Sequence, residues 1–241
     1  MDRAVYDRMA SIDAEHWWFV ARRRIVAALI GRFAPRPAMR LLEVGCGTGS
    51  NLAMLSRFGH VEAIEPDDGA RAIAAGRSGI AIRGGLLPDG VDLPDAGYDM
   101  ILLLDVLEHI GDDAATLRLL RRKLAPGGRL MLTVPAGPWM WSEHDVAHHH
   151  HRRYTAAQLR TVLEAAGFRV IHQSHYNSLL YVPIAAARLI GKMTRRKGGD
   201  DAMPAPWLNR LLASVFGSEA HWIARVRMPF GVSLAAVAVA R

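Results

Sequence analysis

The sequence predicts an α/β fold in which helices cover both faces of a mostly parallel sheet. Apolar segments alternate with segments of helical periodicity from about Met39 onward, which is the pattern of such a sheet. In addition, three glycines two residues apart separate the first apolar segment from the helix that follows it. The 241 residues suffice for a single domain of this kind with additions to its core.

Six apolar segments are expected to form the strands of this sheet. Each is short, and turn or helix signals bound it on both sides. The expected strands are 40–44, 61–65, 100–105, 129–134, 168–174 and 232–240.

Capping residues mark two of the helices between these strands. Asp112 and Asp113 favour the start of a helix, and the Pro-Gly-Gly run at 126–128 stops it. Thr155 and Gln158 have the spacing of a capping box at the start of a second helix. The apolar face of the first helix is expected to comprise Leu117, Leu120 and Leu124.

The glycine run predicts a loop that binds a nucleoside. Gly45, Gly47 and Gly49 lie two residues apart, whereas a dinucleotide loop has its third glycine one residue later. This spacing argues against a pyrophosphate ligand. Glu65 ends the next apolar segment, where a carboxylate can accept hydrogen bonds from both hydroxyls of a ribose. The expected ligand therefore carries a ribose but no pyrophosphate.

The motifs LLEVGCGTG, YDMILLLDVLEHI and LAPGGRLMLTVP, with Glu65 between the first two, resemble the ordered motifs of class I S-adenosylmethionine-dependent methyltransferases. The resemblance covers roughly residues 40–173. It implies a Rossmann-like sheet of seven strands in the order 3-2-1-4-5-7-6 with the last strand antiparallel. It also implies S-adenosyl-L-methionine as the methyl donor.

The resemblance assigns donor contacts position by position. Glu43 is expected to hold the amino end of the donor, the glycine loop its methionine part and ribose, and Glu65 the ribose hydroxyls. Many members place an acid on the adenine after the third strand, but here Ile82 and Arg83 are followed by Gly84. Adenine is therefore expected to contact backbone amides and apolar groups. The expected donor contacts are Glu43, Gly45, Cys46, Gly47, Gly49, Glu65, Pro66, Asp105, Val106 and His109.

Residues 1–38 are expected to form a helical cap before the cofactor-binding core at 39–174. A His-Trp-Trp-Phe-x-x-Arg element begins at His16, and a similar element precedes the core in sequences resembling this one. We expect Trp18 or Phe19 to cover the donor, and Arg22 to meet its carboxylate or an acceptor anion. The alternative is an aromatic stripe packed on the core beside solvated arginines.

A helical insert at 175–231 is expected above the active site, ahead of the final strand at 232–241. It contains helix patterns near 179–190 and 208–223, joined by a basic linker at 192–201. The apolar helix either packs on its own domain, covers a lipid-like acceptor or rests on an anionic membrane through 178–197. Its apolar stretch is too short to cross a bilayer.

The acceptor region is expected between the fifth strand and the helix capped by Thr155. There PAGPWMWSEHDVAHHHHRRYT resembles a subgroup signature. His144 and His150 are the candidate bases, because histidine has a suitable pKa for proton transfer, and Asp145 would orient one of them. The candidate substrate-binding residues are Trp141, Arg152, Arg153 and Tyr154. Arg153 and Tyr154 could equally anchor the helix that follows.

The four consecutive histidines at 148–151 do not predict a metal site. Adjacent side chains in an extended segment point to opposite faces, and the spacing of a structural zinc site is missing from the sequence. The sequence therefore predicts no metal ligand.

Composition limits the possible partners and the cellular location of the protein. The formal net charge is +7, but the basic residues are dispersed and lack interleaved aromatics, so nucleic acid is disfavoured as a partner. A single cysteine, Cys46, rules out an internal disulfide and suits a reducing cytosol. The charged amino-terminal segment does not match a secretory signal. A cytoplasmic protein is expected, with peripheral contact at the inner face of a membrane left open.

The resulting functional prediction is methyl transfer to a small-molecule or lipid-linked acceptor, with oxygen preferred as the acceptor atom. Two alternatives remain open. A nicotinamide-dependent oxidoreductase is disfavoured by the glycine spacing. A non-catalytic protein that binds the donor and serves as a partner or regulatory subunit would share every donor-binding residue.

Overall fold

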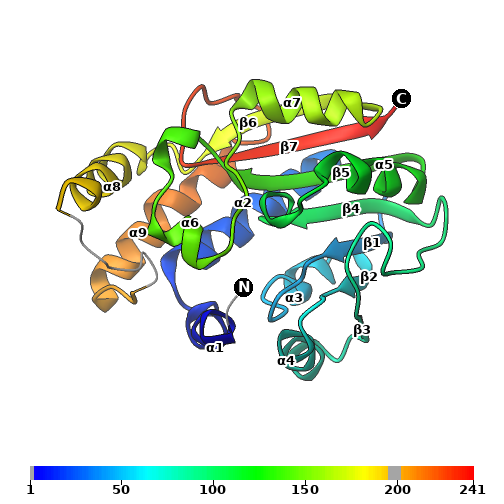
Figure 1. The fold of residues 1–241 in the computed structure, drawn as a ribbon, viewed down its shortest axis with the longest axis horizontal. Helices are drawn as coiled ribbons and strands as arrows, with labels where there is room; N and C mark the ends of the chain where they lie inside the picture. The colour runs from blue at the N-terminus through cyan, green and yellow to red at the C-terminus, as the bar shows by residue number, and fades with distance from the viewer. Residues whose placement is uncertain (1–2, 195–201) are drawn as a thin grey trace.

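The computed structural model describes residues 3–194 and 202–241. A seven-stranded sheet forms its centre, in the expected order β3-β2-β1-β4-β5-β7-β6 (Figure 1). The first five strands are parallel, and β7 runs antiparallel to both of its neighbours. The strands are β1 (Met39–Val44), β2 (Gly59–Ile64), β3 (Ile82–Arg83), β4 (Tyr98–Leu104), β5 (Leu124–Pro135), β6 (Phe168–Tyr176) and β7 (Ser233–Ala240).

Each sheet face carries its own hydrophobic core. Along β4, Met100 and Leu102 pack on one side, whereas Ile101 and Leu103 pack on the other, as alternation in a strand requires. The helices α2 (Trp17–Phe33), α3 (Leu52–Leu55) and α9 (Pro206–Ser218) contribute to the first core, together with α4 (Asp68–Ser78). The helices α5 (Asp113–Lys123) and α7 (Ala156–Ala165) contribute to the second.

The start of β5 differs from the sequence prediction. Leu124 was expected at the end of a helix face, but it pairs with Tyr98 as the first residue of β5. Its N–H still donates to the carbonyl of Leu120, so it caps α5 in an extended conformation. The predicted apolar face survives, because Leu124 packs in the same core as Leu117 and Leu120.

The predicted caps are confirmed. Asp112 caps α5, where its carboxylate accepts a hydrogen bond of 2.8 Å from the N–H of Ala115. Thr155 and Gln158 form the capping box at the start of α7. Both helices therefore begin at the residues that the sequence indicates.

Two helices precede the sheet. α1 (Arg3–Ile12) leads into the predicted aromatic element, and His16 is the N-cap of α2. The N–H of Trp17 donates to Oδ1 of Asn209 at 2.8 Å, and the Trp17 ring packs edge-on against Phe216. These contacts dock α2 against α9, so the amino-terminal cap and the insert support each other.

The insert consists of α8 (Tyr181–Thr194), α9 and the short helix η3 (Glu219–His221). The buried carboxylate of Glu219 accepts hydrogen bonds from the N–H groups of Asn177, Ser178 and Leu179 at 2.7 to 2.9 Å. This contact fixes the chain where it leaves β6 for α8. The predicted basic linker falls largely outside the described residues.

Three further short helices lie beyond the carboxyl ends of β4 and β5: η1 (Leu107–His109), η2 (Pro138–Met140) and α6 (Glu143–Ala147).

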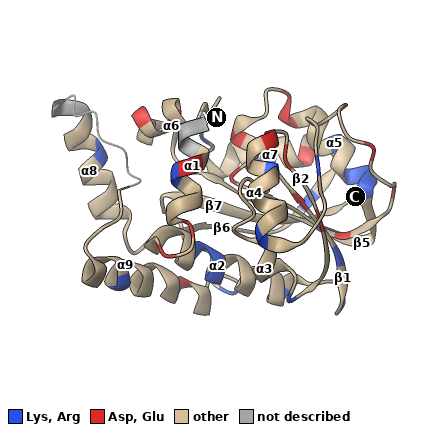
Figure 2. Cartoon of the chain, turned by 90° about the horizontal axis from the view of Figure 1, so that it is seen from below, with Lys and Arg blue, Asp and Glu red and all other residues tan. Residues whose placement is uncertain are grey.

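Basic residues are dispersed over α2, α8 and α9 and near β1 and the C-terminus (Figure 2). No helix within residues 3–194 and 202–241 is long and apolar enough to cross a bilayer.

Candidate active site

A cavity of about 710 Å³ opens at the carboxyl ends of the parallel strands. The glycine loop, α1 and α2 line one part of it, and η1, the segment around α6 and α8 line another. Its position matches the rule that open α/β sheets bind ligands at this edge. Its size is that of a typical small-molecule site.

The glycine loop forms part of the cavity wall. Gly45 has a φ of 69°, and a Cβ there would lie 2.7 Å from the Val106 side chain. Gly47 also lines the cavity, and its N–H donates to Oε2 of Glu65 at 2.8 Å. Gly49 instead packs against Ala74 of α4, outside the cavity lining. Gly49 therefore lies apart from Gly45 and Gly47, the other two glycines expected to contact the donor.

Glu65 follows β2 at the cavity wall, as predicted. Its carboxylate is buried and accepts hydrogen bonds from the N–H groups of Gly47 and Asp67. Tyr6 of α1 donates a third, at 3.2 Å. Burial and the charge of Glu65 raise the pKa of Tyr6, which keeps this hydroxyl a donor. Sequence reasoning missed Tyr6, because a tyrosine in a charged amino-terminal segment gives no signal of a contact 59 residues away.

Glu43 lies buried beneath the loop at the end of β1. Oε1 of Glu43 accepts a hydrogen bond of 2.7 Å from Asn51, whereas Oε2 has no hydrogen-bond partner among the described residues. Burial raises the pKa of Glu43 to about 7, although Asn51 and Arg22 oppose this shift. A buried carboxylate oxygen without a partner fits the ammonium group of an amino acid.

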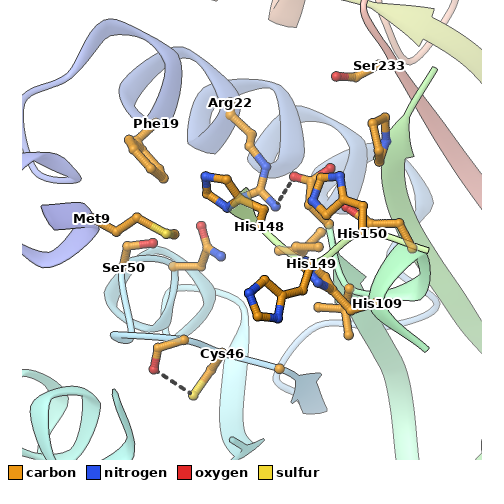
Figure 3. Close-up of a pocket in the computed structure, with 18 of the residues that line it drawn as sticks. Met9, Phe19, Arg22, Cys46, Ser50, His109, His148, His149, His150 and Ser233 are labelled. Atoms are coloured by element: carbon orange, nitrogen blue, oxygen red, sulfur yellow. Dashed lines mark hydrogen bonds and ion pairs between the residues drawn. The ribbon is translucent and has the colours of Figure 1, made fainter. Parts of the chain in front are cut away.

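The aromatic element of α2 also faces the cavity. Arg22 is buried and forms an ion pair of 2.6 Å with Asp105, the residue that follows β4. Its guanidinium lies 5.1 Å from the centre of the Trp18 ring. Trp18, Phe19 and Arg22 all line the cavity, and Figure 3 shows Arg22 and Phe19 projecting from α2. The alternative of a solvated arginine is therefore wrong for Arg22.

The histidine segment forms a second part of the wall (Figure 3). Residues 148 and 149 form a turn at the end of α6, and His149 has a φ of 56°. The premise that this segment is extended is therefore wrong, because His148, His149 and His150 all line the same cavity. The His150 ring also meets His109 of η1, with 4.6 Å between ring centres.

Asp145 orients His150. Its buried Oδ1 lies 2.9 Å from Nδ1 of His150 and 2.8 Å from Nε of Arg153. Oδ2 of Asp145 accepts a hydrogen bond from the N–H of Ser142 at 2.8 Å. Although burial opposes it, the bond to His150 and the charge of Arg153 lower the pKa of Asp145. Asp145 was expected to orient either His144 or His150, and its anionic carboxylate contacts His150.

Two other ionisable groups beside this pair have pKa values shifted towards the neutral form. Burial and the nearby His150 and His148 lower the pKa of His109 to about 3. Burial and the charge of Asp105 raise the pKa of Glu108 well above its usual value.

Three of the four predicted substrate-binding residues lie outside the cavity lining. Arg152 and Tyr154 both donate to Oδ2 of Asp113 at 2.8 Å, so they anchor α5. Trp141 also lies outside the lining, whereas Arg153 is part of it. Tyr154 directly precedes the cap of α7, so its contact with Asp113 fits the alternative in which it anchors that helix, here to α5. Arg152 makes the same contact.

The remaining predicted donor contacts belong to the cavity wall: Cys46, Pro66, Asp105, Val106 and His109. Gly85, Leu86 and Leu87 line it as well, where an adenine without an acidic partner was expected. The cavity therefore fits S-adenosylmethionine: the glycine loop forms its wall, Glu65 can accept the ribose hydroxyls, and the buried Glu43 can accept the amino group.

The fold and this cavity together define a class I S-adenosylmethionine-dependent methyltransferase. A family model described as a methyltransferase domain matches residues 18–173, and the chain belongs to this family. It is thus an S-adenosylmethionine-dependent enzyme rather than a nicotinamide oxidoreductase or a non-catalytic donor-binding protein.

Individual relatives agree with this assignment. The chain is 29% identical over 208 residues to a probable S-adenosylmethionine-dependent methyltransferase of Mycolicibacterium smegmatis, covering 83% of this chain and 78% of the relative. It is 26% identical over 153 residues to a ubiquinone biosynthesis O-methyltransferase of Maricaulis maris, covering 55% of this chain and 60% of that protein. The fold also matches a chain in a solved complex between the Haloferax volcanii Trm112 methyltransferase activator and a methyltransferase. The TM-score is 0.65 at 18% sequence identity, and the match covers 98% of this chain and 94% of that chain.

Proposed function

We propose that this methyltransferase acts on a hydroxyl oxygen of a small-molecule or lipid-linked acceptor. The observation that carries the proposal is the pair of Asp145 and His150, in which the histidine lines the cavity that also contains the glycine loop. A histidine held by a carboxylate is a suitable group for removing a hydroxyl proton.

The donor end of the cavity comprises Glu43, the loop from Gly45 to Gly47, and Glu65. Glu43 attracts the ammonium, and Glu65 accepts hydrogen bonds from the ribose hydroxyls. When bound, S-adenosylmethionine supplies a methyl group that its sulfonium already activates. The protein mainly has to align the acceptor and exclude water. Trp18 and Phe19 of α2 line the cavity, and their aromatic rings exclude water from it.

At the acceptor end, His150 takes the hydroxyl proton through the nitrogen that Asp145 does not occupy. Asp145 fixes the ring and its tautomer, as the carboxylate of a catalytic triad does. Arg153 lies beside this pair and lines the cavity. His144, the other base candidate, lines the same region with its ring centre 6.3 Å from that of His150.

The apolar surface of α8 supports a lipid-linked acceptor. Val182, Leu189 and Ile190 are large apolar side chains exposed on this helix, while Ile184 of the same helix lines the cavity. A helix with apolar groups on both sides can contact a membrane surface and the active site together. The similarity to a ubiquinone biosynthesis O-methyltransferase also favours oxygen as the acceptor atom.

Methylation of an acceptor panel tests the proposal. The panel contains phenolic, sugar and hydroxyacyl compounds together with matched amines and thiols, and mass spectrometry locates the added methyl group. We expect transfer to oxygen that requires His150, so that His150→Ala loses about a hundredfold or more in rate while binding S-adenosylhomocysteine normally. Transfer to nitrogen or sulfur alone, or full activity of His150→Ala, would refute the proposal.

A further inference from the structure

We propose that Glu108, His109 and His150 bind a divalent transition-metal cation at the acceptor end of the cavity. Each side chain offers one ligand atom, and the three atoms lie within 4.8 Å of one another. Ligands of a tetrahedral cation lie about 3.4 Å apart at the usual bond lengths. Side-chain movements of roughly 1 Å would therefore close the three groups around one ion.

The orientation of His150 matches that of a metal ligand. Its Nδ1 lies 2.9 Å from the carboxylate of Asp145, which leaves Nε2 for an ion in the cavity. Asp145 is itself held by Arg153 and by the N–H of Ser142. Histidines that bind metals usually have their second nitrogen fixed by such a carboxylate.

Glu108 provides an independent observation. Its side chain is completely buried, and neither carboxylate oxygen has a hydrogen-bond partner among the described residues. Burying a carboxylate without partners is costly unless an ion or another polar group satisfies it. Because His109 follows directly in η1 and its ring lies beside His150, a cation at this point would satisfy Glu108 and use both imidazoles.

The ligand set selects the class of cation. Two imidazoles and one carboxylate suit zinc, iron(II), cobalt(II) or manganese(II), whereas magnesium and calcium prefer oxygen ligands throughout. Three protein ligands leave a position for a further ligand from the cavity. An acceptor hydroxyl is the group that the proposed function would bring there.

This inference rests on the proposed function and replaces the role of His150 as a base, because the same nitrogen cannot both bind the cation and accept a proton. With a cation present, His150 holds the ion, and the ion lowers the pKa of the acceptor hydroxyl. The hydroxyl proton leaves to solvent water. A lone pair of the acceptor oxygen then forms the new bond to the methyl carbon, and the electron pair of the broken carbon–sulfur bond remains on sulfur.

Cation binding is measured on the full chain without an affinity tag, after treatment with a chelator. Zinc binding is followed by calorimetry and elemental analysis, and cobalt(II) absorption reports the coordination geometry. We expect one cation per chain, with at least hundredfold weaker binding in Glu108→Gln and His109→Gln. Asp145→Asn should weaken it ten- to hundredfold, as expected for a residue that orients a ligand.

His151→Ala is the matched control, because it alters the histidine run and spares all three ligands. It should keep the cation. Absence of stoichiometric binding, or binding lost in His151→Ala but kept in Glu108→Gln, would overturn the inference. Thermal unfolding followed by circular dichroism checks that each variant is folded. If Glu108→Gln does not fold, the His109→Gln variant provides the test.

The two proposals fail in different ways. Oxygen methylation by a chain that binds no stoichiometric cation would overturn the metal site and leave the proposed function intact. Stoichiometric cation binding with methyl transfer only to nitrogen or sulfur would instead overturn the proposed function.

Discussion

The hydroxyl of Tyr6 lies 3.2 Å from Oε1 of Glu65, and this contact joins the first helix to the end of β2. Glu65 is the carboxylate that the sequence assigns to the ribose. α1 therefore reaches the donor site, where Met9 and Ile12 line the cavity as well. Donor binding should depend on Glu65 itself much more than on the tyrosine.

We expect Glu65→Ala to weaken S-adenosylhomocysteine binding by about ten- to a hundredfold, because the variant loses hydrogen bonds between the ribose hydroxyls and a charged carboxylate. Tyr6→Phe should change it by less than about fivefold, because ribose hydroxyls can replace the tyrosine as donors to Glu65. Isothermal titration calorimetry measures both. Equal losses in the two variants would contradict the assignment of Glu65 to the ribose.

Donor affinity should depend on pH through Glu43. Burial raises its pKa to about 7 in the free protein, and the donor ammonium favours the ionised carboxylate. Binding below pH 7 must therefore displace a proton, and the affinity should fall by up to about tenfold per pH unit. Glu43→Gln should bind weakly at pH 8 and lose this dependence. A wild-type affinity that stays constant from pH 5 to 8 would contradict this role.

The same group should affect stability in the absence of donor. The pKa of Glu43 is about 7 in the folded chain, against its ordinary value of 4.5, which applies in the unfolded chain. Between these two pH values the folded chain therefore binds more protons than the unfolded chain. The free energy of unfolding therefore decreases as pH rises through this window. We expect Glu43→Gln to unfold at a higher temperature than wild type at pH 8, with a smaller difference at pH 5, in differential scanning calorimetry.

Asp145 should position the acceptor end without contributing to donor binding. Asp145→Asn removes a charge held between His150 and Arg153, and breaking such a buried pair costs about 3 kcal/mol. We expect methyl transfer to fall at least a hundredfold while the affinity for S-adenosylhomocysteine stays within threefold. Arg152→Ala is the control: it loses the contacts to Asp113 and to the carbonyl of Gly111, both outside the cavity lining, and should retain transfer. A reversed order of the two variants would refute this division of roles.

The fold was predictable because its signals are local. Each signal depends on a few neighbouring residues: the short apolar segments that predict strands, the caps at Asp112 and Thr155, and the glycine spacing. The error at Leu124 has a local cause as well, since a residue that ends a helix and pairs with Tyr98 satisfies both patterns. The strand order required the family resemblance, because periodicity carries no information on neighbours in a sheet.

The candidate site was predictable only in part. Glu43, Glu65 and the pair of Asp145 and His150 follow from motifs, whereas Tyr6 and the unpartnered Glu108 depend on contacts between distant segments. The prediction for the histidine segment was wrong because it treated residues 148–151 as an extended chain. The turn after α6, with its positive φ at His149, brings neighbouring histidines to one wall of the cavity.

α1 is fastened to the glycine loop through Asp13. Its buried carboxylate accepts hydrogen bonds from the Thr48 hydroxyl at 3.0 Å and from Arg77 at 2.8 Å. Asp13→Ala leaves Thr48 without this acceptor and removes the ion pair to Arg77. Arg77 is partly exposed and keeps its hydrogen bonds to the carbonyls of Ala10 and Thr48, so the loss of this ion pair contributes less.

We therefore expect Asp13→Ala to lower the free energy of unfolding by about 2 kcal/mol, since a buried charge-assisted contact is lost. Donor affinity should fall as well, because the loop and α1 line the same cavity. Urea unfolding and calorimetry measure the two effects. Asp68→Ala, which removes an exposed carboxylate paired with Arg71, should leave both within error. Loss of stability with unchanged donor affinity would show that α1 supports the fold without shaping the donor site.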